Sequence, residues 1–294
     1  MLTGIVAGLL AGALWGLVFV APRMVDGFGS VDLTAGRFLV YGIVAVAVCV
    51  VTRRPWPDGR QALAAIGMSL LGFTGYYLLL VLAIRDAGTE VPSLVIGTIP
   101  LWVMLLGKPG HLRWGALLPG IAFTAAGLAL MMAAPHAGEA PAGPHFWRGV
   151  LLACASLACW TAFALLNSAW LKRHPEVNAT DWANWLGLAT GAGAIVLWAV
   201  AGSDLATLRA QPGAPLFALL VVATGFGSAW LATILWNVAS QRLSASLCGQ
   251  LIVSETLFAL AYSFAWDGVW PTELQAGAVV LFTAGILASI KAHR

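Results

Sequence analysis

Aromatic and small residues share a helical face in two distant parts of the chain. In GIVAGLLAGALWG, residues 4–16, glycine recurs once per helical turn, and Trp15 falls inside the same arc at about 100° per residue. Trp160 likewise shares a face with small residues, at Gly149, Ala153, Ser156 and Ala164. A face toward lipid would carry Leu, Ile and Val. We interpret the glycines as close packing within one chain and the indoles as walls of a ligand cavity, with core packing as the alternative.

Other polar and aromatic side chains lie deep in apolar runs and extend this candidate site. Asn167 falls on the face of Trp160, and Trp230 and Asn237 share a face at spacing i, i+7. Adjacent tyrosines cannot both point to one place. Indoles can stack on an aromatic ligand, while amides and hydroxyls can bind its polar ends. The predicted cavity residues are Trp15, Tyr76, Tyr77, Trp102, Trp160, Asn167, Trp230 and Asn237, and Trp236 is a further deep indole that we did not assign to the site.

Two charged residues within apolar runs need an explanation. Glu255 lies about ten residues into the run 245–265, where an ionised carboxylate costs several kcal/mol unless it is paired, hydrated or protonated. It could attract an ammonium group or carry a coupling proton; alternatively, it could bond to a neighbouring helix near Pro100. We favour a structural or gating role. Arg37 is expected to snorkel from the outer end of its helix to the lipid headgroups.

The elements that would position these residues are membrane-spanning helices. Of the 294 residues, 60% are hydrophobic and 9% are charged, and the mean hydropathy is +0.89, against roughly 25% charged residues in soluble domains. Ten apolar runs predict ten helices, which places both termini on one side. Ten of the 15 Lys and Arg residues fall on that side, so both termini are expected to be cytoplasmic. The runs are 2–20, 33–51, 62–84, 91–107, 114–133, 148–170, 182–201, 214–237, 245–265 and 273–290.

Weak internal similarity indicates a duplication. ALW (13–15) resembles ACW (158–160), GFTGYYLL (72–79) resembles GFGSAWLA (225–232), and SLVIGTIPLW (93–102) aligns with CGQLIVSETL (248–257) at a similar offset. We therefore expect five-helix repeats at 1–133 and 148–294, joined by a connector at 134–147. Because five is odd, the second repeat would be inverted. The predicted fold is an all-α membrane protein of two inverted repeats around a central cavity near the bilayer midplane.

The same motifs are similar to those of a known family. The glycine-rich first helix that ends in W-G, the two GF pairs, IP (99–100) and SET (254–256) resemble the EamA-type branch of the drug/metabolite transporter superfamily, and within it the bacterial aromatic amino acid exporters. The resemblance implies a ten-helix, multi-pass carrier of the bacterial inner membrane, with helices 1, 3, 4, 6, 8 and 9 around the cavity. It also implies that the position of Glu255 is common to carriers of different solutes.

These observations lead to a secondary transporter that exports aromatic or hydrophobic amino acids by alternating access. The alternative is an exporter of the same fold for lipophilic cationic drugs or other small metabolites, because Glu255 and the aromatic residues would also suit a cation. An enzyme is disfavoured, because all five histidines lie in loops or at the terminus. We expect a monomer in the lipid bilayer that uses no cofactor, metal or nucleic acid. Because no P-loop motif occurs, any energy source would be a gradient. Proton coupling and facilitated diffusion both stay open.

Overall fold

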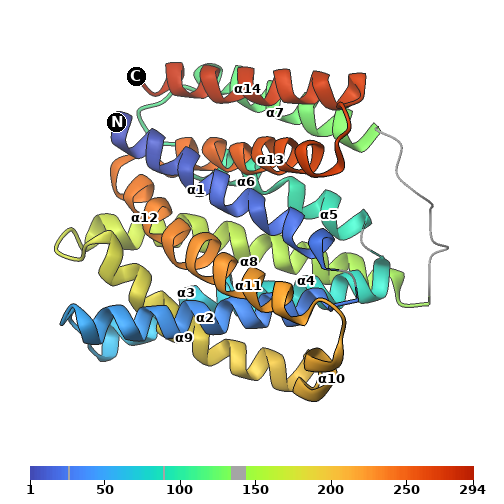
Figure 1. The fold of residues 1–294 in the computed structure, drawn as a ribbon. Coiled ribbons are helices and arrows are strands. Elements are labelled where there is room, and N and C mark those ends of the chain that lie inside the picture. Colours follow the sequence, from blue (N-terminus) through green and yellow to red (C-terminus); the bar gives the residue numbers. More distant parts are fainter. Residues whose placement is uncertain (26, 89, 134–143) are drawn as a thin grey trace.

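The computed structural model describes residues 1–25, 27–88, 90–133 and 144–294, and every regular element within these ranges is helical. Most of the predicted connector, 134–143, lies outside the described residues. The helices lie alongside one another in a bundle, and both chain termini lie at the same end of it, at the left in Figure 1. The all-helical membrane architecture is therefore confirmed, whereas the side of the membrane on which the termini lie stays a prediction.

In the described ranges, nine helical segments are long and apolar enough to span a membrane. Several are built from more than one helix in direct succession. The nine are α1 (Leu2–Val20) with η1 (Ala21–Met24), α2 (Ser30–Val51), α3 (Gly59–Gly72) with α4 (Thr74–Ala87), α7 (Trp114–Ala133), α8 (Phe146–Arg173), α9 (Ala179–Ala201), α11 (Ala214–Thr224) with η2 (Gly225–Leu231) and α12 (Ala232–Arg242), α13 (Ala245–Asp267), and α14 (Glu273–Ala292). The short helix α10 (Leu205–Ala210) lies between α9 and α11.

The remaining predicted span, 91–107, is not one continuous helix. It consists of α5 (Glu90–Gly97) and α6 (Ile99–Leu106), and the break falls at Thr98. Pro100 lies in the first turn of α6, where its missing N–H and its ring are tolerated, whereas inside a continuous helix they would disrupt the preceding turn. This apolar pair is shorter than the other spans. Ten membrane crossings therefore stay a prediction.

Both GF pairs mark an interruption of regular helix. Phe73 separates α3 from α4 with φ −131° and ψ −90°, and its ring lies 5.4 Å from that of Phe163. Gly225, of the second GF pair, begins the π-helical turn η2. Such turns are rare and are often found at functional sites. The two motifs thus fall at interruptions of different kinds, and the duplication stays a prediction.

The glycines of α1 pack against α13, as predicted for close packing within one chain. A Cβ atom on Gly12 would lie 3.1 Å from the backbone nitrogen of Glu255, and one on Gly16 would lie 2.9 Å from that of Ala259. No side chain larger than hydrogen fits there unless the helices separate. This contact fixes α13 on α1 at the depth of Glu255.

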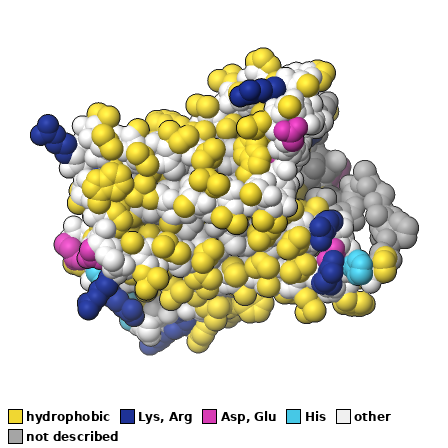
Figure 2. All heavy atoms as spheres, turned by 90° about the horizontal axis from the view of Figure 1, so that it is seen from below, with side chains coloured by type: hydrophobic (Ala, Val, Ile, Leu, Met, Phe, Trp, Pro, Cys, Tyr) yellow, Lys and Arg dark blue, Asp and Glu magenta, His cyan; other side chains and the backbone are white. Residues whose placement is uncertain are grey.

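Further polar contacts join helices across the bundle and at its ends. Tyr41 on α2 donates its hydroxyl to the carbonyl oxygen of Ala183 on α9 over 2.7 Å, and these two helices lie side by side in Figure 1. Arg148 on α8 forms two hydrogen bonds with Asp86 on α4, of 2.6 and 2.9 Å. Figure 2 shows a broad hydrophobic surface with charged side chains near its margins, as expected for a protein that faces lipid.

Candidate functional site

Three tryptophans from separate helices meet in the bundle. Trp15 on α1 lies 6.3 Å from Trp160 on α8 between ring centroids, and Trp236 on α12 lies 5.3 Å from Trp15 and 6.2 Å from Trp160. We call these three residues the tryptophan cluster. Trp15 and Trp160 are half-buried, so part of each indole stays accessible. The predicted association of these two residues is therefore present, and Trp236 is a member that the assigned site omitted.

Trp236 differs from the other two in its burial and its polar atom. Its side chain is 1% exposed, and its Nε1 has no hydrogen-bond partner among the residues that the structure describes. A buried tryptophan usually satisfies its N–H group. Because α12 contacts both α1 and α9, the sequence alone could not decide which helix this indole faces.

The two predicted asparagines lie in a buried interhelical network. Asn167 on α8 donates from Nδ2 to Oδ1 of Asn237 on α12 over 3.1 Å and accepts 2.6 Å from Nε1 of Trp182 on α9. Asn237 also donates to the carbonyl oxygen of Ala179 over 3.3 Å. All three side chains of the network are fully buried. Their amides are engaged with protein groups, which joins α8, α9 and α12.

Trp230 and Trp102 lie apart from the tryptophan cluster. Trp230 donates from Nε1 to Oδ1 of Asn184 on α9 over 2.8 Å, so its indole is tied to the same helix as Asn237. Trp102 is 46% exposed and lines a lateral groove of about 370 Å³ between α6 and α8, together with the exposed Cys154. The structure therefore brings together only part of the predicted set.

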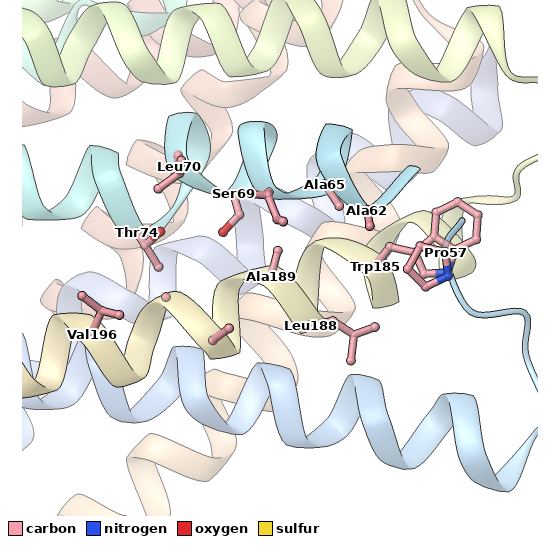
Figure 3. A pocket seen from close by; sticks show the side chains of 13 residues that line it. Pro57, Ala62, Ala65, Ser69, Leu70, Thr74, Trp185, Leu188, Ala189 and Val196 are labelled. Carbon is pink, nitrogen blue, oxygen red and sulfur yellow. The ribbon is translucent and has the colours of Figure 1, made fainter. Parts of the chain in front are cut away.

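A second lateral groove, of about 470 Å³, lies between α3 and α9 (Figure 3). Its lining is mainly apolar, with Ser69, Thr74 and Trp185 among the labelled side chains. None of the predicted cavity residues lines it. We therefore do not assign this groove to the candidate site.

The two adjacent tyrosines of α4, Tyr76 and Tyr77, are both half-buried. The Tyr77 hydroxyl donates 2.8 Å to the carbonyl oxygen of Ser30, and its ring lies 6.3 Å from that of Phe38. The Tyr77 hydroxyl is thus engaged with a protein group.

The prediction that Arg37 snorkels to the headgroups is wrong. Its Nε is buried without a hydrogen-bond partner in the described part of the chain, and its guanidinium carbon lies 4.9 Å from the centroid of the Phe38 ring. A Cβ atom on Gly225 would lie 2.8 Å from the Arg37 carbonyl oxygen, so η2 packs directly on this turn of α2. The buried Nε and the contact with Phe38 therefore place the guanidinium against protein.

Glu255 is half-buried on α13. Within the described ranges its carboxylate forms no hydrogen bond or ion pair, and this includes the residues around Pro100. No group of three or more His, Cys, Asp or Glu residues that could hold a metal occurs in the described part of the chain. The candidate site is therefore the tryptophan cluster, and Arg37 and Glu255 are two opposite charges without an ion pair among the described residues.

Comparisons with known proteins agree with this architecture. The EamA-like transporter family matches residues 2–133. The chain is 30% identical to inner membrane protein YtfF of Escherichia coli over 314 residues, which covers 99% of this chain and 96% of the relative. It is 25% identical to aromatic amino acid exporter YddG of Ancylobacter novellus over 274 residues, covering 88% of each chain. One crystal structure shares the fold with a TM-score of 0.79 at 22% identity, covering 99% of this chain and 97% of the other. The chain is a multi-pass membrane protein and belongs to the EamA-like transporter family.

Proposed function

We propose that this protein exports aromatic and other hydrophobic amino acids across the bacterial inner membrane. The tryptophan cluster is the observation that carries the proposal. Trp15, Trp160 and Trp236 come from three helices, and their ring centroids lie 5.3 to 6.3 Å apart, within the range of edge-to-face and offset contacts. A flat aromatic side chain would make the same contacts with the accessible parts of Trp15 and Trp160. The similarity to an aromatic amino acid exporter supports this choice of substrate.

The unpaired donor of Trp236 adds a polar feature to this site. An unsatisfied buried N–H group costs about 1–3 kcal/mol, and a carbonyl or carboxylate oxygen of a bound ligand would remove that cost. We assign Tyr76 to the wall of the site. Trp230, Asn167 and Asn237 support the site from the side of α9, whereas Tyr77 and Trp102 lie outside it.

Helix packing supports alternating access by two inverted repeats, residues 1–133 and 148–294. In these repeats α1 corresponds to α8, α4 to α12, and α5 with α6 to α13. If each helix is exchanged for its counterpart, the contact of α1 with α12 becomes that of α8 with α4. The contact of α1 with α13 becomes that of α8 with α5 and α6. The pairs α2–α9 and α7–α14 map onto themselves. This is the pattern that a two-fold axis in the membrane plane would produce. We infer a monomeric carrier with cytoplasmic termini and no cofactor.

A lipophilic cationic drug is a second candidate substrate. Glu255 is a half-buried carboxylate without an ion pair among the described residues, so it could neutralise a cation. The face of an indole also attracts cations, with about 0.5–2 kcal/mol per contact. The cation and the amino acid would use the same cluster, and transport measurements separate them.

Reconstitution into liposomes tests the proposal. Efflux of tryptophan, threonine and tetraphenylphosphonium is followed with and without a pH gradient. We expect saturable tryptophan efflux that exceeds threonine efflux. Trp15→Ala and Trp160→Ala should each raise the KM for tryptophan about fivefold, because one lost aromatic contact is worth about 1 kcal/mol. The matched control is Trp270→Ala, since that side chain is 93% exposed. Transport of the cation alone would refute the amino acid proposal, and unchanged KM values in both cluster variants would refute the site.

A further inference from the structure

The lateral groove between α6 and α8 lies on a different face of α8 from the tryptophan cluster. Its volume is about 370 Å³, and none of the described residues that line it is charged. Thr161 and Leu165 are rotated roughly 100° and 140° around α8 from Trp160. The groove is therefore open to the lipid and not to the cluster. Its lining includes Trp102 and Leu106 of α6 and Cys154, Leu157, Thr161 and Leu165 of α8.

Thr161 lacks the hydrogen bond that other helical threonines of this chain make. Thr224, Thr233 and Thr283 donate their hydroxyls to the carbonyl oxygen four residues earlier, over 2.6 to 2.8 Å. Thr161 is 6% exposed, and its Oγ1 is buried without a partner among the described residues. Such a donor is unfavourable in apolar surroundings. Thr161 lies near the middle of the 28-residue helix α8, where the acyl chains of a bilayer offer no acceptor.

Trp102 supplies an aromatic surface from the α6 side of the groove. Its side chain is 46% exposed, whereas the indole of Trp182, which packs between helices, is fully buried. The other residues that line the groove are leucine, alanine and cysteine. An exposed indole among apolar side chains favours a flat aromatic ligand. The groove thus combines an aromatic face, apolar walls and one unused hydrogen-bond donor.

The sequence of α8 explains why this seam is open. In the predicted repeats, the alignment of ALW with ACW places Leu157 and Thr161 where α1 has Gly12 and Gly16. The two glycines let α1 approach the backbone of α13. Leucine and threonine carry side chains at the corresponding positions, so α8 cannot meet α6 as closely. The groove therefore follows from the residues of α8 themselves.

We propose that this groove binds a neutral, lipophilic aromatic molecule that carries a hydrogen-bond acceptor and reaches the protein through the bilayer. Its ring packs on Trp102, its apolar body lies against Leu157 and Leu165, and its carbonyl or ether oxygen accepts a hydrogen bond from Thr161. Threonine has two accessible χ1 rotamers in a helix, so a rotation presents the hydroxyl to the ligand. A charged ligand would find no counter-charge in this lining. The inference goes beyond the proposed function and does not depend on it.

Photolabelling of the intact protein in lipid nanodiscs tests the site. The probe is benzophenone, a neutral aromatic ketone that inserts into nearby C–H bonds under light, and peptide mass spectrometry locates it. Insertion should concentrate on the lining residues of α6 and α8. Fluorenone and fluorene then compete with the probe, because they share one ring system and only fluorenone has a carbonyl acceptor. At equal concentration in the bilayer, fluorenone should compete about fivefold more effectively.

Matched variants separate the hydroxyl from the packing. Thr161→Val keeps the shape of the side chain and should remove the preference for fluorenone. The control is Thr74→Val, because Thr74 is also 6% exposed with an unpartnered Oγ1 but lines the groove between α3 and α9. Trp102→Ala should weaken both competitors about fivefold. Trp266→Ala removes an indole that is 53% exposed and should leave the labelling unchanged.

Two results in the wild-type protein would overturn the proposal without any substitution. Insertion spread evenly over the lipid-facing helices would mean that the groove is not a site. Equal competition by fluorenone and fluorene would indicate an apolar surface that acyl chains cover. A preference for fluorenone that persists in Thr161→Val would refute the assigned donor. None of these measurements involves tryptophan transport, so the proposed function can fail while this site stands, and the reverse.

Discussion

Replacement of Asn167 by alanine separates a packing role from a substrate-binding role. The substitution leaves Nε1 of Trp182 and Oδ1 of Asn237 without their partners at 2.6 and 3.1 Å, and both side chains are fully buried. Interhelical hydrogen bonds in membranes contribute about 0.6 kcal/mol on average and 1.7 kcal/mol at most, while a buried unsatisfied group costs about 1–3 kcal/mol. With two groups affected, we expect the free energy of unfolding to fall by about 2 kcal/mol.

The assay is reversible unfolding in mixed micelles, combined with transport kinetics for the folded protein. Asn237→Ala should cost a similar amount, and the double variant should cost less than the sum because the two residues share one hydrogen bond. The KM for tryptophan should change less than threefold in both single variants. A tenfold higher KM together with unchanged unfolding would refute this reasoning and would place Asn167 in contact with the substrate.

Three further predictions concern packing and charge. Gly12→Val should strongly destabilise the protein, because even a Cβ atom there would lie 3.1 Å from a backbone nitrogen of α13. The control is Gly67→Val, where a Cβ atom would meet open space. Equal unfolding temperatures for the two variants would contradict the close packing. Tyr41→Phe should lower the free energy of unfolding by about 1 kcal/mol, since it removes the hydrogen bond from a buried hydroxyl to the Ala183 carbonyl oxygen. No change in chemical denaturation would argue against that bond. A double-mutant cycle of Arg148→Gln and Asp86→Asn should give a coupling free energy below about 1 kcal/mol, because the arginine side chain is 55% exposed. A larger coupling free energy would indicate a desolvated ion pair.

Hydrophobic runs were sufficient to predict most of the helical segments. The runs 2–20 and 33–51 correspond to Leu2–Val20 and Ser30–Val51, because continuous apolar stretches of this length form spanning helices in a bilayer. The run 91–107 has the same apolar character, yet Thr98 separates two short helices there. Hydropathy does not register a backbone break, and Pro100 was the only local signal for it.

The site was predictable only where the chain repeats itself. Trp15 and Trp160 were linked by the similarity of ALW to ACW, and the structure brings them into one cluster. Trp236 has no such counterpart among the quoted repeats. Arg37 was assigned from its distance to the helix end, which fixes depth in the membrane but not direction around the helix. The packing of η2 on α2 decides that direction, and it depends on contacts between distant segments.

Helical periodicity grouped residues correctly without showing what their face contacts. Trp230 and Asn237 were predicted to share a face, and both form hydrogen bonds to α9, so the face belongs to a helix–helix contact. Trp236, about 100° away from Asn237, points instead to Trp15. Hydrogen bonding distinguishes the two environments, because the indole N–H of Trp230 has a protein partner and that of Trp236 has none in the described residues. The partner of the indole N–H therefore separates the helix–helix contact at Trp230 from the tryptophan cluster, a distinction that the aromatic face alone does not make.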